Sequence, residues 1–332
     1  MAESRRPGPA SEPRPSTAVF LMNLGGPRSL EEVKPYLRQL FGDPLVVSAP
    51  LGPFRPLLAR LVSHFRAPSS AEKYTLIGGR SPLVEGTRAQ ARALASRLGP
   101  GFTVHLAMRY GHPDTAEGVR QALAAGAERA VALPLYPQFA NATTTSSLQE
   151  MRRRWPRDRP LFEVCSYHDH RGWLDACAAT VRDALGRVKP ENRGKALVVF
   201  SAHGIPMSQV RRGDPYPKEV EASSRGVAER CGLAAGEWRV TYQSKVGPAR
   251  WLGPDTIEFL RASAGGRAVV AVPIAFVSEH LETLYDLDIL AAQAAREGGA
   301  LEYHRAAAVG DQPDFAAALA AVVRRTLGAG AP

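Results

Sequence analysis

Residues 269–288 read VVAVPIAFVSEHLETLYDLD, and this segment changes character halfway along its length. Its first part, Val269 to Phe276, is a continuous apolar run, which is typical of a strand buried on both faces of a sheet. Its second part carries one imidazole and four carboxylates: His280, Glu279, Glu282, Asp286 and Asp288. Ligands of open α/β sheets bind beyond the carboxyl ends of the strands. The segment therefore predicts a buried strand that leads into a functional site.

The spacing of these polar residues limits the local geometry. On a helix that begins near Glu279, Glu282 and Asp286 are four positions apart and share a face. His280 and Glu282 are two positions apart and would diverge on a regular helix. We therefore expect His280 at the helix entry or a π-distorted turn. The alternative is that one or two of these acids simply favour the positive end of a helix.

A second apolar strand, Ala196 to Phe200, leads to His203. Parallel strands end at one edge of a sheet, so His203 can meet the residues near Glu282. A neutral imidazole opposite a carboxylate is a proton-transfer pair, and the same groups also bind iron or zinc. A lone histidine after a strand can also be structural. The absence of G-x-S-x-G and H-E-x-x-H motifs disfavours serine and zinc hydrolases.

Strand-like and helix-like segments alternate along the chain. Further strands are expected at 18–22, 103–108, 130–135, 161–165 and 239–243, and helices at 29–41, 84–98, 114–125, 172–185, 218–231 and 314–327. Ser29 and Glu32 form a capping-box pattern at the first of these helices. The alternation predicts an α/β fold of two similar halves, each a parallel sheet flanked by helices.

The chain divides into four parts on this basis. We expect a disordered tail at 1–16, a first half at 17–160, a second half at 161–313 and a closing C-terminal helix at 314–332. Within the first half, residues 44–66 are unusually apolar. Phe54, Leu57, Leu58, Leu61 and Phe65 recur there at helical spacing. Such a stripe faces a core, or it forms an exposed lip for a flat hydrophobic ligand or a membrane surface.

The net charge of +10 does not indicate a nucleic-acid partner. Of the 42 basic residues only six are lysines, and this skew towards arginine in an alanine-rich chain suggests coding bias. No long basic block with interleaved aromatic residues occurs, so we expect no nucleic-acid binding.

Cysteine usage and hydropathy favour a cytoplasmic protein. The three cysteines, Cys165, Cys177 and Cys231, show neither metal-ligand spacing nor an even-numbered disulfide pattern, which fits a reducing compartment. No apolar run reaches the ~20 residues that a membrane span needs. The first sixteen residues lack the hydrophobic centre of a signal peptide.

Eight motifs in order carry a resemblance to a known family. They are NLGGP (23–27), YTLIGGRSPL (74–83), MRYGHP (108–113), PLYPQ (134–138), FSAHGIP (200–206), RGDPYP (212–217), YQSKVGP with WLGP (242–248 and 251–254), and the segment 269–288. Together they resemble the ferrochelatases, from about residue 18 to residue 327. The resemblance implies a lyase of haem biosynthesis that inserts ferrous iron into protoporphyrin IX, with loss of two pyrrole protons, to form protohaem.

The resemblance also implies roles for individual residues. Two Rossmann-like halves would clamp the porphyrin between them without binding a nucleotide. His203 would face the pyrrole nitrogens, Glu282 would be its partner across the ring, and Asp286 would be the next carboxylate on a path for protons or metal. The residues around the macrocycle would be Leu24, Tyr74, Ser81, Arg109, Tyr110, Trp251, Phe276 and His280.

Two departures from the family pattern matter. Many relatives carry a further acid one turn after Asp286, where this chain has Leu290. Cys165 stands where some relatives place the first ligand of a [2Fe–2S] cluster, but no cysteine follows Cys231. Three thiolates cannot complete the usual four-ligand site, so we expect no cluster and no permanent cofactor. Ferrous iron is then a substrate.

Three alternatives stay open. One is a coproporphyrin ferrochelatase, and another is a cobalt or nickel chelatase of a polar tetrapyrrole such as sirohydrochlorin. The third is a non-catalytic haem carrier. The apolar stretch 44–66 argues against a polycarboxylate substrate, which would prefer a basic entrance. We expect a cytoplasmic monomer or homodimer, in peripheral contact with the inner face of the cell membrane.

Overall fold

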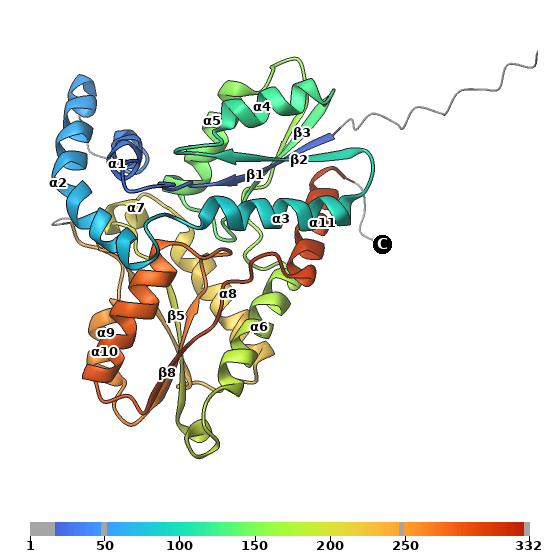
Figure 1. The fold of residues 1–332 in the computed structure, drawn as a ribbon. Helices are drawn as coiled ribbons and strands as arrows, with labels where there is room; N and C mark the ends of the chain where they lie inside the picture. Colours follow the sequence, from blue (N-terminus) through green and yellow to red (C-terminus); the bar gives the residue numbers. More distant parts are fainter. Residues whose placement is uncertain (1–16, 48–51, 246–248, 329–332) are drawn as a thin grey trace, which may run out of the picture.

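The computed structural model describes residues 17–47, 52–245 and 249–328, and it contains two four-stranded parallel sheets (Figure 1). The first sheet has the order β2-β1-β3-β4: β1 Thr17–Asn23, β2 Phe102–Met108, β3 Arg129–Pro134 and β4 Leu161–Glu163. The second has the order β6-β5-β7-β8: β5 Ala196–His203, β6 Trp238–Gln243, β7 Ala268–Pro273 and β8 Glu302–Arg305. The two sheets repeat one topology, so the expected fold of two Rossmann-like halves is confirmed.

Helices connect these strands. The α-helices are α1 Val33–Gly42, α2 Arg55–Leu76, α3 Leu83–Leu98, α4 Thr115–Ala124, α5 Ser146–Arg154, α6 Arg171–Gly186, α7 Met207–Arg211, α8 Tyr216–Arg230, α9 Thr256–Ser263, α10 Ala292–Glu297 and α11 Pro313–Thr326. Shorter 3-10 segments are η1 Gly52–Phe54 and η3 Pro190–Lys195, and the π-helices are η2 Asn141–Thr145 and η4 Glu282–Ala291.

Both faces of the central strands are buried, which explains their continuous apolar sequences. In β1, Val19 and Leu21 face the core shared by the two halves, whereas Phe20 and Met22 face the core beneath α4 and α5. Alternate residues of a strand point to opposite faces, so a strand covered on both sides needs apolar residues at every position. β7 follows the same rule, because all six of its residues are buried.

One large core joins the two halves. It combines side chains from β1 and α3 of the first half with side chains from α6, α8 and β5 of the second. α11 packs against both α3 and α6, and Figure 1 shows it between the two halves. The ring of Phe315 on α11 lies 5.8 Å from that of Trp173 on α6. The C-terminal helix therefore ties the halves together.

Three details differ from the sequence-based expectations. We expected the second half to begin at residue 161, but β4 pairs with β3 and belongs to the first sheet. We expected Ser29 to cap α1, but the helix begins at Val33, and the Glu32 carboxylate accepts from the backbone N–H of Arg28 at 2.9 Å. We expected a strand up to Phe276, but β7 ends at Pro273, which has no N–H to extend the ladder. The expected tail, 1–16, lies outside the described residues.

The apolar stripe between residues 44 and 66 is exposed rather than buried. Four of its side chains are between 53% and 71% exposed, namely Phe54, Leu57, Leu61 and Phe65. Leu58 is half-buried. The opposite face of α2 carries small residues, Ala59 and Ser63, and packs closely against α1 (Figure 1). We call the exposed four residues the apolar lip. Within the described residues, no helix is long and apolar enough to cross a membrane.

Candidate active site

His203 and Glu282 stand at the carboxyl ends of neighbouring strands of the second sheet. His203 is the last residue of β5, and Glu282 opens the π-helix η4 that follows β7. In the strand order, β5 is followed by β6 on one side and β7 by β8 on the other, so the strand order reverses between β5 and β7. Open α/β sheets bind ligands at the carboxyl ends of strands at such a switch point. The charges of Glu282 and Asp286 both act on the His203 imidazole. The fold therefore brings the two carboxylates close enough to His203 to affect its charge.

His280 lies beside Glu282 at the start of the π-helix. η4 is a π-helix over ten residues, and His280 precedes it, so both expected ways of accommodating His280 occur at once. The Thr283 hydroxyl accepts from the His280 backbone N–H at 3.0 Å. His280 Nε2 then lies 3.2 Å from Glu282 Oε2, which a regular helix would not allow for residues two apart.

The four carboxylates of this segment separate into two pairs. Glu282 and Asp286 point to the His203 region, whereas Glu279 and Asp288 bind the guanidinium of Arg305 at 2.9 and 2.6 Å. We expected Glu279, His280 and Glu282 to stand together; the charge of Glu279 acts on His280, while its carboxylate is also bound by Arg305. The Arg305 side chain is largely buried and needs carboxylate partners, which these two residues supply.

Burial and charge set the protonation states of the site. Burial lowers the pKa of both His203 and His280, so their imidazoles are neutral near neutral pH. Burial raises the pKa of Glu282, but His280, His203, a backbone hydrogen bond and Lys73 together leave this pKa below its ordinary value. Burial and the charge of Glu282 raise the pKa of Asp286, although Ser244 Oγ donates to it at 2.6 Å. The neutral imidazole of His203 therefore lies near the ionised carboxylate of Glu282 and the more basic carboxylate of Asp286.

A buried network of hydrogen bonds holds the backbone at Glu282 in place. Gln243, at the end of β6, donates through Nε2 to the backbone carbonyl of Glu282 at 2.9 Å. Its Oε1 accepts from Ser201 Oγ at 2.6 Å, and Ser201 also contacts Thr256 at 3.0 Å. Strands β5 and β6 and helix α9 thus fix the start of the π-helix. Sequence reasoning placed Gln243 in the YQSKVGP motif but gave it no role, because its partners Ser201 and Glu282 are distant in sequence.

Aromatic side chains border His203 in the second half. The Phe276 and His280 rings lie 4.4 Å apart. Trp251 pairs with Pro206 through a β-bridge, and a Cβ added at Gly204 would lie 3.4 Å from its ring. Trp251 therefore covers the backbone directly after His203.

The first half brings the end of α2 to the same place. Tyr74 is buried there, and burial together with the charge of Glu282 raises the pKa of its hydroxyl well above the ordinary value. Lys73 Nζ lies 5.1 Å from the centre of the Tyr285 ring. Leu24 follows β1, is half-buried, and accepts at its carbonyl from the Tyr110 N–H at 2.9 Å. The two halves thus meet at the His203 and Glu282 region.

Three other residues expected around the macrocycle are bound within the first half. The Asp43 carboxylate accepts from the Arg109 guanidinium at 2.6 Å and from the Tyr110 hydroxyl at 2.9 Å. Ser146 Oγ donates to the same oxygen at 2.6 Å. Ser81 is buried against Gly26, where an added Cβ would lie 2.6 Å from its side chain. Asp43 was missed because an acid between a helix and a proline reads as an ordinary turn.

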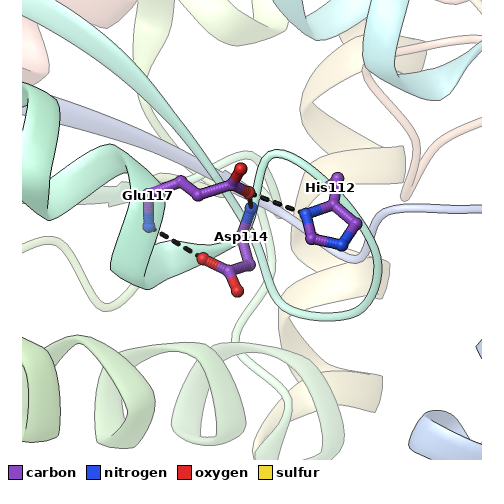
Figure 2. Close-up of side chains that lie close together, drawn as sticks. All are labelled: His112, Asp114 and Glu117. Atoms are coloured by element: carbon purple, nitrogen blue, oxygen red, sulfur yellow. Dashed lines mark hydrogen bonds and ion pairs between the residues drawn. The ribbon is translucent and has the colours of Figure 1, made fainter.

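A second group of metal-ligating side chains has a structural explanation. In the described part of the chain, ligand atoms of His112, Asp114 and Glu117 lie within 4.8 Å of one another (Figure 2). The Glu117 carboxylate accepts from the Asp114 N–H at 2.7 Å, and Asp114 accepts from the Glu117 N–H at 2.8 Å. This is the capping box of α4, to which His112 adds an exposed contact at 2.8 Å.

The chain is similar in sequence to members of one protein family. The sequence profile of the Ferrochelatase family matches residues 16–327. Ferrochelatase from Caulobacter vibrioides is 42% identical over 318 residues, which cover 94% of this chain and 90% of that protein. Ferrochelatase from Synechococcus elongatus is 41% identical over 321 residues, which cover 93% and 82%.

Among solved structures, "SirB from Bacillus subtilis with Fe3+" has a similar fold, with a TM-score of 0.52. It is 14% identical, and the match covers 94% of this chain and 95% of SirB, so the likeness concerns the fold alone. The sequence matches extend over both sheets and over the segment that carries His203 and Glu282. The chain therefore belongs to the ferrochelatase family, whose members insert a metal ion into a porphyrin.

Proposed function

We propose that this protein inserts ferrous iron into protoporphyrin IX to form protohaem. The observation that carries the proposal is a half-buried His203 at the end of β5, on which the charges of Glu282 and Asp286 act where the two halves meet. A metal ion enters a porphyrin only when two N–H protons leave and the ring bends to expose its lone pairs. The site must therefore supply a base near the ring centre and walls that hold a bent ring.

The protein side chains account for the proton transfers. His203 accepts a pyrrole proton, because its lowered pKa keeps the imidazole neutral and able to act as a base. Glu282, held by Gln243 through its backbone, is the partner carboxylate. The raised pKa of Asp286 lets it take up a proton more readily than an ordinary aspartate and pass it outward through Ser244. The same carboxylates give ferrous iron oxygen ligands along its path.

The walls come from both halves. In this proposal, Tyr74 and Leu24 line the site from the first half. Trp251, Phe276 and His280 line it from the second. Arg109 keeps part of its guanidinium accessible and remains a candidate for a porphyrin carboxylate. Tyr110 and Ser81 are buried, so in this proposal they do not contact the porphyrin but hold Leu24 and Gly26 in position.

The proposed enzyme uses no [2Fe–2S] cluster and no permanent cofactor. Burial raises the pKa of the Cys177 thiol to about 12, which makes it a poor source of thiolate. Cys165 is exposed and Cys231 is partly buried. With only three cysteines in the sequence, four thiolate ligands are not available within one chain.

A direct assay tests the function and its alternatives. Ferrous iron is supplied without oxygen to the protein with protoporphyrin IX or coproporphyrin III, and metallation is followed by absorbance. We expect faster metallation of protoporphyrin, because the exposed apolar lip suits the less polar porphyrin. Faster metallation of coproporphyrin would favour the alternative ferrochelatase. Binding without turnover would indicate a carrier, and turnover of sirohydrochlorin with cobalt or nickel would indicate the other chelatase class.

The apolar lip supports peripheral contact with a membrane on the cytoplasmic side. Protoporphyrin partitions into lipid, and the lip carries arginines between its apolar residues, as interfacial helices do. Burial of two such side chains is worth roughly 3–6 kcal/mol, which is enough for reversible binding. We expect the wild type to float with anionic liposomes. Leu57→Asp/Leu61→Asp should stay in the soluble fraction and raise the KM for protoporphyrin.

Leu301→Asp is the control for this pair, because Leu301 is an exposed leucine next to β8, outside the lip. It should float like the wild type. The membrane proposal is wrong if the lip variant floats normally and keeps normal kinetics.

A further inference from the structure

Gln90 connects the first half to the segment that carries His280 and Glu282. It lies on α3, is only 2% exposed, and uses its whole amide group. Its Nε2 donates to the carbonyls of Val277 at 2.9 Å and Gly310 at 3.0 Å, and its Oε1 accepts from Ser278 Oγ at 3.0 Å. All three partners belong to the second half.

Two of these partners, Val277 and Ser278, lie directly before His280 and Glu282 in the chain. Between the end of β7 at Pro273 and the start of η4 at Glu282 the chain has no regular ladder of hydrogen bonds. Buried backbone groups in such a stretch need other partners, because unpaired ones are costly. On one side the segment is held by Glu279, which binds Arg305 and the N–H of Ala308. Gln90 holds it from the side of the first half.

The close approach of α3 strengthens this contact. Gly86 lies one turn before Gln90 on the same helix face, and a Cβ added there would lie 3.6 Å from the Ser278 side chain. The helix and the segment are therefore in contact over a full turn. A displacement of α3 relative to the second half would move residues 277 and 278 directly.

We propose that Gln90 is a positioning residue for metal insertion: its amide transmits the position of the first half to the segment that carries His280 and Glu282. This inference rests on the proposed function. Gln90 does not touch the reacting atoms. It sets the distance between the partner carboxylate and His203, and a small error in that distance slows proton transfer strongly.

Gln138 provides a matched control for ordinary interface stabilisation. It is also buried, and its Nε2 donates across the halves to Ser223 Oγ at 2.9 Å and to the Ile274 carbonyl at 3.2 Å. Its contact with the irregular segment is at Ile274, the first residue after β7, whereas Gln90 contacts Val277 and Ser278, close before His280. Loss of Gln138 should therefore weaken the interface without displacing His280 and Glu282.

The test compares Gln90→Met with Gln138→Met, since methionine keeps the length and packing of glutamine but forms no such hydrogen bonds. We expect Gln90→Met to lower kcat by about 10- to 100-fold with a porphyrin Kd close to that of the wild type. Gln138→Met should lower the melting temperature to a similar extent but keep kcat within about threefold. Equal losses of kcat in both variants, or no loss in Gln90→Met, would overturn the proposal.

Hydrogen exchange supplies a readout that does not depend on turnover. The backbone amides of residues 277–284 should exchange faster in Gln90→Met than in the wild type, and should be unchanged in Gln138→Met. Unchanged exchange in Gln90→Met would contradict the positioning role even if the enzyme were active. If the wild type metallates no porphyrin, the proposed function is refuted. The hydrogen-exchange comparison would still show whether Gln90 holds residues 277–284 in place.

Ser278→Ala completes the experiment as a double-mutant cycle. It removes one of the three hydrogen bonds of Gln90, so we expect a smaller loss of kcat than in Gln90→Met. In the Gln90→Met background it should cause almost no additional loss, because its partner is already absent. Fully additive losses would show that the two side chains act separately and would contradict the proposal.

Discussion

His203→Ala is expected to lower kcat for iron insertion by about 10²- to 10⁴-fold while porphyrin binding survives. The substitution removes the proposed base, but it leaves the proposed walls, Trp251, Phe276 and Tyr74, in place. Absorbance of the metallated product measures turnover, and quenching of protein or porphyrin fluorescence measures binding. The two measurements together separate loss of chemistry from loss of the site.

The pH dependence of the wild type checks the same assignment. Burial lowers the pKa of His203, so the imidazole stays neutral, and active as a base, until the pH falls below the ordinary value of 6.5. We therefore expect the acid limb of kcat to lie below pH 6.5. His112→Ala is the control, because His112 is exposed and pairs with Glu117 at the cap of α4. Near-normal turnover in His203→Ala would refute the role of His203.

Glu282→Gln is expected to lose most of the activity, by about 10²-fold or more, because an amide cannot accept the proton that a carboxylate accepts. The shape of the side chain is kept. The hydrogen bond from Gln243 reaches the backbone carbonyl of Glu282, so the substitution leaves it intact. The melting temperature should therefore stay close to that of the wild type, and kcat should fall without a matching change in porphyrin binding.

Asp288→Asn is the matched control for this loss. Asp288 lies on the same π-helix but pairs with Arg305, away from His203. It should keep its activity within a few-fold and lose some stability. If Glu282→Gln stays within a few-fold of the wild type at every pH, Glu282 has only a structural role.

The sequence alone determined the architecture and the two catalytic candidates. Each central strand is covered on both faces, so runs such as residues 18–22 and 196–200 must be apolar throughout and are easy to recognise. Parallel strands end at one edge, which placed His203 and Glu282 in one region before any contact was known. These inferences were possible because they depend on local patterns and on a general rule of sheet topology.

The tertiary structure alone decided which polar residues act together. Asp43 and Arg109 are 66 residues apart, and Gln90 and Ser278 are 188 apart, so no local spacing links them. The carboxylates of Glu279 and Asp288 look equivalent to those of Glu282 and Asp286 in sequence. Their different roles follow from the position of Arg305 on β8, which the chain brings to them only after folding.

The orientation of the apolar lip was likewise fixed by packing. Helical spacing identifies a face of α2 but does not say whether that face points inward. The structure buries the small residues Ala59 and Ser63 against α1, because small side chains let two helices approach closely, and this leaves the large residues Leu57 and Leu61 outside. A periodic pattern gives the faces of a helix, but only the neighbouring element determines which of them is buried.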